Sequence, residues 1–145
     1  MFFLKELPSR QMIAGYSDSV GVPADTVARG LSMMRRASLL IRRLESYFAQ
    51  HGLSQLRFLL LIVIDREPDR DTLTVGEITA RLDVAGPIVA RTLRTLLAEQ
   101  LVVVTRDGGD ARTKHVGLTA KGQALLQRLL PGYFAIIAEE MATAE

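Results

Sequence analysis

Hydrophobic residues recur with helical spacing through the first third of the chain. After Pro23, which suits a first helical turn, apolar side chains return three, four or seven positions apart. They are Val27, Leu31, Met34, Ile41, Leu44 and Phe48. This pattern predicts one long amphipathic helix over about residues 24–49. Its opposite face carries Arg35-Arg36 and Arg42-Arg43, which we expect at a solvated or partner-facing surface.

A nearly continuous apolar segment follows this helix. Gly52 is typical of a helix end and Ser54 of an N-cap, and the next residues predict a second, central helix to about residue 66. Its apolar residues include Leu56, Leu60, Val63 and Ile64. The charged segment 67–71 surrounds Pro68, and we expect it to form a solvated loop.

Two short helices come next. Residues 74–77 have the form of a capping box, and Val75, Ile78 and Leu82 give the third helix an apolar stripe. After a turn at 83–86, Pro87 opens a fourth helix, which ends at Gln100. One face of it holds Val89, Leu93, Leu96 and Leu97, and the opposite face holds Pro87, Arg91, Arg94 and Thr95. Two short helices across a tight turn suggest a helix-turn-helix.

The last third of the chain predicts a hairpin and then more helix. Residues 101–106 and 113–118 favour two strands joined by a glycine-containing tip at 107–112. Thr119 caps a fifth helix whose buried stripe is Leu125, Leu126, Leu129 and Leu130. We expect Pro131 to break or kink it, so that a last helix covers about 132–142.

Both ends of the chain are more apolar than a monomer should leave in water. The residues concerned are Phe2, Phe3, Leu4 and Leu7 at one end, and Tyr133, Phe134, Ile136, Ile137 and Met141 at the other. A homodimer that packs these segments together would cover them. The predicted fold is therefore mainly α (α+β), a winged helix-turn-helix with flanking dimerisation helices. We assign residues 1–145 to one domain, with dimerisation helices at 1–50 and 119–145 and the winged lobe at 54–118.

Composition narrows the class of protein. The 145 residues are 48% hydrophobic and 23% charged, which suits one ordinary globular core, and the formal net charge is only +2. The absence of Cys excludes disulfides, thiolate metal sites and thiol switches. The longest apolar run, 58–64, is too short to span a bilayer, and the N-terminus lacks the pattern of a signal peptide. We therefore expect a cytoplasmic protein with no membrane partner.

Three segments carry a resemblance to a known family. They are 51–58 (His-Gly-Leu-Ser-Gln-Leu-Arg-Phe), 73–78 (Leu-Thr-Val-Gly-Glu-Ile), and Asp110-Ala111-Arg112 followed by 116–122 (Val-Gly-Leu-Thr-Ala-Lys-Gly). Together they closely resemble the MarR family of bacterial transcription regulators, over roughly residues 24–131. The Leu-Thr-x-x-Gly ending after an Asp-x-Arg wing is the most specific part of the match.

This resemblance implies a homodimer on an inverted-repeat DNA operator, with a recognition helix in each major groove and a wing in each flanking minor groove. We expect Arg91 and Arg94 to contact phosphates or guanine edges, Thr95 to contact the backbone, and Arg112, oriented by Asp110, to enter the minor groove. The full predicted contact set is Thr74, Gly86, Pro87, Ile88, Ala90, Arg91, Arg94, Thr95, Arg106, Asp110, Arg112 and Lys114. Residues 81–121 carry a local net charge of +3, which favours this surface.

The recognition helix departs from the family in its first turn. Family members usually place Ser, Thr or Arg there, whereas this chain has Ala85, Gly86, Pro87, Ile88 and Ala90. Ile88 and Ala90 can pack on thymine methyl groups, and the helix N-terminus can offer amides to a phosphate. Sequence preference should then depend on Arg91, the wing and DNA shape. The alternative is an architectural or protein-partner-binding winged helix with weak, non-specific DNA affinity.

The resemblance also implies an effector site between the dimerisation helices and the DNA-binding lobe. Its candidate lining residues are Met34, Tyr47, His51, Arg57, Phe58 and Tyr133. Arg57 or His51 would face the carboxylate of a small aromatic or lipophilic anionic effector, with Phe58 and Met34 as apolar contacts. The competing interpretation places Met34 and Phe58 in the core and His51 at the surface.

An enzyme would need a nucleophile and base, a carboxylate pair or a metal cage. The two histidines, His51 and His115, belong to different predicted elements and have no ligand-spaced neighbours. We therefore expect no catalytic residues, metal or cofactor. The sequence predicts a ligand-responsive repressor.

Overall fold

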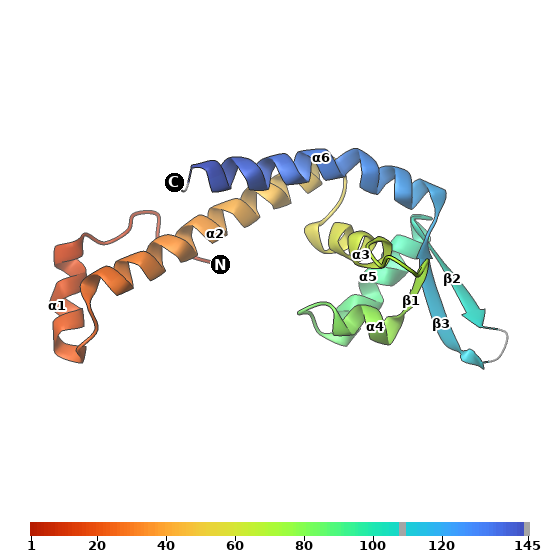
Figure 1. Ribbon diagram of the computed structural model, residues 1–145, viewed down its shortest axis with the longest axis horizontal. Coiled ribbons are helices and arrows are strands. Elements are labelled where there is room, and N and C mark those ends of the chain that lie inside the picture. Colours follow the sequence, from red (N-terminus) through yellow and green to blue (C-terminus); the bar gives the residue numbers. More distant parts are fainter. Residues whose placement is uncertain (108–109, 144–145) are drawn as a thin grey trace.

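The computed structural model describes residues 1–107 and 110–143, without the side chains of Asp107, Asp110 and Ala111. In chain order the elements are α1 (Arg10–Val20), α2 (Ala24–Gln50), α3 (Gln55–Asp65), β1 (Thr72–Thr74), α4 (Val75–Ala80), α5 (Gly86–Ala98), β2 (Val102–Asp107), β3 (Asp110–Leu118) and α6 (Ala120–Ala142). In Figure 1 the long helices α2 and α6 lie side by side, α1 folds back at the far end of α2, and the remaining elements form a separate lobe. The predicted winged helix with flanking helices is confirmed.

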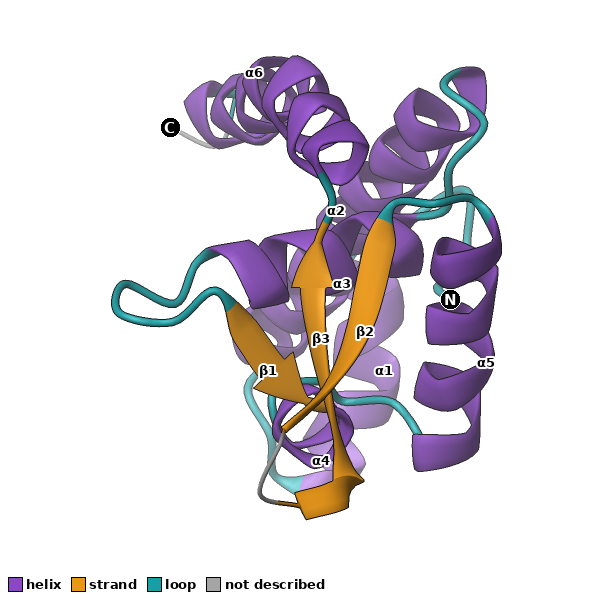
Figure 2. Cartoon of the chain, turned by 90° about the vertical axis from the view of Figure 1, so that its right-hand side faces the viewer, coloured by secondary structure: helices purple, strands orange, loops and turns teal. Residues whose placement is uncertain are grey.

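The lobe is built from a helix-turn-helix and a small sheet. The strands are antiparallel in the order β1-β3-β2, with Val104 opposite Val116 and Leu73 opposite Val116 on the other side. These apolar residues pack on the helices, and the β2–β3 hairpin projects beyond them as the wing (Figure 2). The fully buried residues beneath include Leu60, Ile78, Val89 and Leu96. The lobe therefore has its own core, which fixes α5 against α3 and the sheet.

A second core joins the lobe to the long helices. Phe48 from α2, Phe58 from α3 and Leu129 from α6 are fully buried in it. Ion pairs on the flank add to this contact, since Arg43 meets Glu139 at 2.8 Å and Arg36 meets Glu140 at 3.8 Å. Arg36 and Arg43 thus bind carboxylates of α6 while their side chains remain 38% and 44% exposed, in agreement with the predicted solvated surface.

The sequence pattern missed two elements. Helix α1 begins at the N-cap Ser9, whose Oγ accepts from the Met12 amide at 3.2 Å, and ends at Gly21 with φ 73°. Strand β1 has only three residues and exists because it pairs with β3, which lies more than 40 positions away in the chain. A strand of this kind has no local pattern of its own.

Helix α6 differs from its prediction. It runs without a break from Ala120 to Ala142, with Pro131 inside it. Proline removes one helical hydrogen bond, but residues on both sides of it, Leu126 and Leu129 before and Tyr133 after, pack into the same core along α2. Tertiary packing therefore holds one helix where the local rule predicted two. Tyr133, Ile136 and Ile137 contact this core, whereas Phe134 remains 56% exposed.

The loop at 67–71 is also less free than expected. Glu67 binds Arg81 at 2.7 Å, and Arg70 binds Glu77, so the loop is tied to α4 at two points. Among the described residues, no single helix is long and apolar enough to cross a membrane, although α2 and α3 together pass the same test as a pair bent by 87°.

Candidate nucleic-acid interface

The helix-turn-helix begins with a fully formed capping box. The Thr74 Oγ accepts from the Glu77 amide at 3.1 Å, and the Thr74 amide donates to Glu77 Oε1 at 3.0 Å. The Arg70 guanidinium and the Thr74 amide hold the pKa of the Glu77 carboxyl far below its ordinary value. Thr74, predicted to touch DNA, is thus half-buried with its hydroxyl engaged in starting α4.

Helix α5 presents one face to the lobe and the other to solvent. Val89, Leu93 and Leu96 are buried against the core, as the spacing predicted, whereas Leu97, expected on the same face, is 44% exposed. The helix begins at Gly86, one residue earlier than predicted, and its N-cap Ala85 supplies no side-chain hydrogen bond. The solvent-facing side of α5 therefore begins with the residues of the turn that joins α4 to α5.

The polar groups on that exposed face are few. The Thr92 hydroxyl donates to the Ile88 carbonyl at 2.7 Å, and the Thr95 hydroxyl donates to the Arg91 carbonyl at 3.2 Å. In the part of the chain that the structure describes, neither Arg91 nor Arg94 has an ion-pair partner, and both are exposed. The two guanidinium groups are thus the ionic groups that α5 offers outward.

The wing adds a second group of cations. Arg106 on β2 is directly opposite Lys114 on β3, and both are exposed, as is Arg112. The predicted orienting role of Asp110, and the tip at 108–109, lie outside the described residues and side chains.

Two other cations of the +3 segment act within the chain. Arg81 binds Glu67 at 2.7 Å and donates to the Glu77 carbonyl at 2.9 Å. Lys121 donates from Nζ to the Glu99 carbonyl at 2.9 Å. The exposed cations of this segment are therefore concentrated on α5 and on strands β2 and β3.

Comparison with known proteins finds a matching family model and a sequence relative. A family model described as the MarR family matches residues 51–113. The HTH-type transcriptional repressor YetL of Bacillus subtilis (strain 168) is 28% identical over 140 residues, which cover 95% of this chain and 83% of the relative. The winged lobe, residues 51–113, is thus similar to the MarR family.

Two solved structures of MarR-like fold extend the comparison. Sco3205, a MarR family transcriptional regulator from Streptomyces coelicolor in complex with DNA, has a TM-score of 0.70 and 21% identity, over 81% of this chain and 72% of that one. Bordetella bronchiseptica BpsR, whose DNA binding is regulated by 6-hydroxynicotinic acid, has a TM-score of 0.66 and 19% identity, over 77% and 82%. Both show the fold. YetL and Sco3205 are a transcriptional repressor and a transcriptional regulator, and neither is named as an enzyme.

The structure brings together only part of the effector site expected from the MarR resemblance. Phe58 stacks on Phe48 at 4.5 Å between ring centroids and lies 5.0 Å from Tyr133, while Tyr47 meets the edge of His51 at 5.0 Å. The Tyr47 hydroxyl donates to the Leu129 carbonyl at 2.8 Å. These aromatic side chains fill the junction between the long helices and the winged lobe.

The other two predicted lining residues are placed differently. Arg57 is held by Glu99, with Nη1 and Oε1 2.5 Å apart, and also donates to the Gly52 carbonyl at 3.2 Å. Met34 precedes Tyr47 by 13 positions on α2, about 20 Å along a helix axis. Sequence reasoning missed Glu99, because a partner 42 positions away leaves no local signal.

Proposed function

We propose that this protein is a homodimeric repressor that binds an inverted-repeat operator. Residues 54–118 form its DNA-binding lobe, and residues 1–50 and 119–145 form its dimerisation part. Each α5 enters a major groove, and each wing reaches a flanking minor groove. The observation that carries the proposal is the exposed pair Arg91 and Arg94 beside the exposed wing cations.

Electrostatics favours DNA as the occupant of this surface. A row of phosphates gives Arg91 and Arg94 a counter-charge that the described side chains do not, and the exposed Arg106 and Lys114 on the wing add to the positive charge that meets it. Arg112, at the distal part of the hairpin, suits the narrow and electronegative minor groove. DNA complexes of MarR-like relatives such as Sco3205 support the same arrangement.

The exposed apolar surface supports a second copy as the dimer partner. Apart from Ile88, Leu97 and Val103, every exposed large hydrophobic residue that the structure describes lies in residues 1–50 or 119–145. On α1, Met12, Tyr16 and Val20 are spaced by four residues and are 64–83% exposed. Such a stripe stays in water only at a cost that a second copy removes.

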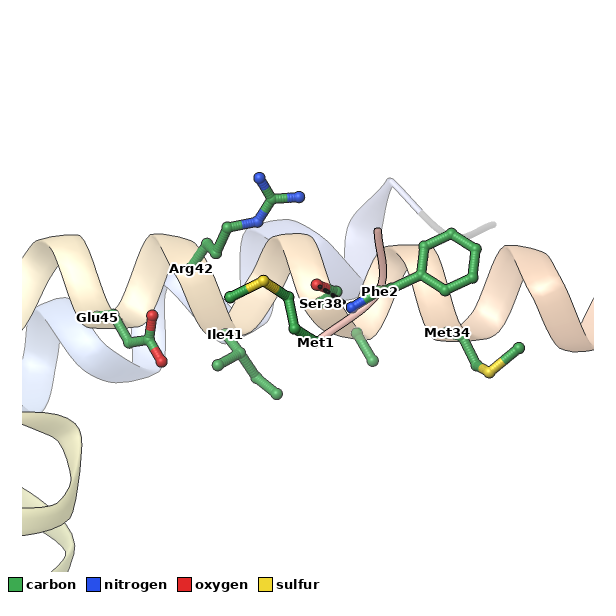
Figure 3. A pocket seen from close by; sticks show the side chains of 8 residues that line it. Met1, Phe2, Met34, Ser38, Ile41, Arg42 and Glu45 are labelled. Carbon is green, nitrogen blue, oxygen red and sulfur yellow. Dashed lines mark hydrogen bonds between the residues drawn. The ribbon is translucent and has the colours of Figure 1, made fainter. Parts of the chain in front are cut away.

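Two apolar grooves lie on the same part of the molecule. Met1 and Phe2 lie along α2 between Met34 and Glu45, where they border a cavity of about 530 Å³ (Figure 3). A second groove of about 460 Å³ separates α1 from α2. In the proposed dimer the helices of the second copy fill both grooves.

Effector control is part of the proposal, with a small aromatic acid as the effector class. BpsR, whose DNA binding responds to 6-hydroxynicotinic acid, supports this class. The carboxylate would bind Arg57 or His51, and the ring would contact Tyr47, Phe58 and Tyr133. Met34, about 20 Å along α2 from Tyr47, lies outside this site. Because Arg57 holds Glu99, the residue that ends α5, an anion that takes over Arg57 would release the end of the recognition helix.

The test starts from a library of duplexes with a randomised core. Rounds of binding should enrich a palindromic sequence whose half-site centres are one helical turn apart, about 10 base pairs. The mass of the complex should correspond to two chains per duplex, and 6-hydroxynicotinic acid or benzoate should weaken it. A library that remains random would instead favour the architectural or partner-binding module.

A further inference from the structure

The first turn of α5 is apolar on its exposed side. Ala85, Gly86, Pro87 and Ile88 are all exposed, and none carries a side-chain donor or acceptor. Ile88 is 38% exposed although it is a large hydrophobic residue. The helix therefore leads with an aliphatic side chain at the end where recognition helices meet base edges.

The neighbours of Ile88 do not change that character. Thr92, one turn later, donates its hydroxyl to the Ile88 carbonyl at 2.7 Å, so that this hydroxyl is turned back onto the helix. Arg91 lies three positions after Ile88 on the same face, and Arg94 three positions after Arg91. The exposed edge of α5 is thus ordered from an aliphatic group to two cations.

Base edges in the major groove differ in how they meet an aliphatic group. Guanine, adenine and cytosine present donors or acceptors, which lose water against Ile88 without gaining a hydrogen bond. Thymine presents an O4 acceptor too, but beside it lies a C5-methyl group, which gains by burial against an aliphatic side chain. We propose that Ile88 packs on a thymine C5-methyl in each half-site, so that the operator is selected for this methyl group rather than for a hydrogen-bonding pattern.

This inference rests on the proposed function, because it needs α5 in the major groove. The apolar first turn of α5 is continuous with Arg91 and Arg94. This argues for DNA as its occupant, since a protein partner docking there would also cover two exposed cations. The methyl group is also a property that can be removed alone, because uracil differs from thymine only by its absence.

The experiment combines a change in the DNA with a change in the protein. The duplex enriched from the random library is synthesised with dT replaced by dU, one position at a time. At one position in each half-site, this replacement should weaken wild-type binding about three- to fivefold, the equivalent of burying one methyl group. Ile88→Ala should weaken binding to the unmodified duplex by a similar factor and should no longer distinguish dT from dU.

Leu97→Ala is the matched control, because Leu97 is 44% exposed on the C-terminal part of the same helix. It should bind both duplexes like the wild type, and far-UV circular dichroism should show that both variants are folded. Wild-type affinity that is unchanged at every dT-to-dU position would overturn the inference while leaving operator binding intact. Equal dU sensitivity in Ile88→Ala would also overturn it. A library with no enriched duplex would overturn the proposed function itself, and this inference with it.

Discussion

At the scale of single residues, Arg91 and Arg112 are expected to act differently on DNA. Arg91 lies on the exposed face of α5, three positions after Ile88, where its guanidinium can reach a guanine edge. Arg112 lies exposed on the wing, where in the proposed complex it would meet the DNA backbone and the minor groove. Arg91 should therefore affect the sequence preference, and Arg112 the overall affinity for DNA.

Arg91→Ala should relax the preference at one operator position in each half-site, at a cost of about 1–3 kcal/mol for the preferred base. Binding measured across single-base variants of the enriched duplex tests this. Arg128→Ala, which removes an exposed cation from α6, serves as the control. An unaltered preference profile for Arg91→Ala would remove Arg91 from base reading.

Arg112→Ala should weaken binding to all duplexes by a similar factor, because it removes a contact to the backbone and to groove shape. We expect a loss of about 1–3 kcal/mol, measured by titration against the enriched duplex and its variants. If the affinity does not change for any duplex, the wing does not bind DNA as proposed.

The sequence predicted single residues well where one element decides their position. Arg91 and Arg94 were expected opposite Val89 and Leu93, and the helical spacing alone places them there. Arg57 was expected to face a ligand, but it is held by Glu99, which approaches from the end of α5. Contacts between distant segments depend on the fold, and no local pattern shows them.

At the scale of elements, the start of α4 depends on a charged capping box. Glu77 releases its proton more readily in the folded chain, because Arg70 and Thr74 lower its pKa there. This favours folding above the ordinary pKa of a glutamate, about 4.3, and the benefit is lost as the pH falls below that value. The wild type should therefore lose stability on acidification partly through this one group.

Glu77→Gln tests this, because glutamine keeps the capping acceptor and removes the charge. Thermal unfolding followed from pH 7 to pH 3 should show a smaller loss of stability in this variant than in the wild type. Glu6→Gln, at an exposed position outside the helices, should follow the wild type. Identical acid sensitivity in Glu77→Gln and the wild type would contradict the assignment.

The junction between the wing and α6 requires a glycine. A Cβ at position 122 would lie 2.1 Å from the Leu101 carbonyl oxygen, which already accepts from the Thr119 amide at 3.1 Å. Gly122→Ala should therefore destabilise the fold by about 1–3 kcal/mol, measured by chemical denaturation. Gly76→Ala in α4, where the nearest atom is 4.0 Å away, should be neutral or stabilising. If Gly122→Ala is as stable as the wild type, the backbone at this junction can move to make room for a Cβ, and the glycine is not required.

Helices were predicted correctly where the local sequence pattern agrees with the packing of the helix in the fold. The predicted helix 24–49 is confirmed as α2, which ends at Gln50. Helix α1 was missed although Ser9 and Gly21 mark its ends, because its stripe of Met12, Tyr16 and Val20 faces solvent instead of a core in this chain. At Pro131 the local rule failed because packing on α2 outweighs one lost hydrogen bond.

At the scale of the whole molecule, the account depends on two copies. A substitution at Phe134 tests dimerisation without disturbing the fold, because Phe134 is 56% exposed. Ile137 is less suitable, because it contacts the core between α2 and α6. Phe134→Asp should shift the molecule from dimer toward monomer in sedimentation, since a carboxylate in an apolar interface costs several kcal/mol. Leu97→Asp, on the other lobe, should remain dimeric. A dimer unchanged by Phe134→Asp would place the interface elsewhere.

Binding to the DNA upstream of the protein's own gene would decide whether the chain is a sequence-specific regulator. It is titrated at about 50 and 200 mM salt, with random duplex as competitor. The account predicts binding that survives the competitor and weakens roughly a thousandfold between the two salt concentrations, if the dimer makes about six phosphate contacts. Binding that any random duplex removes equally would contradict a sequence-specific regulator, and would trace the loss to the apolar first turn of α5.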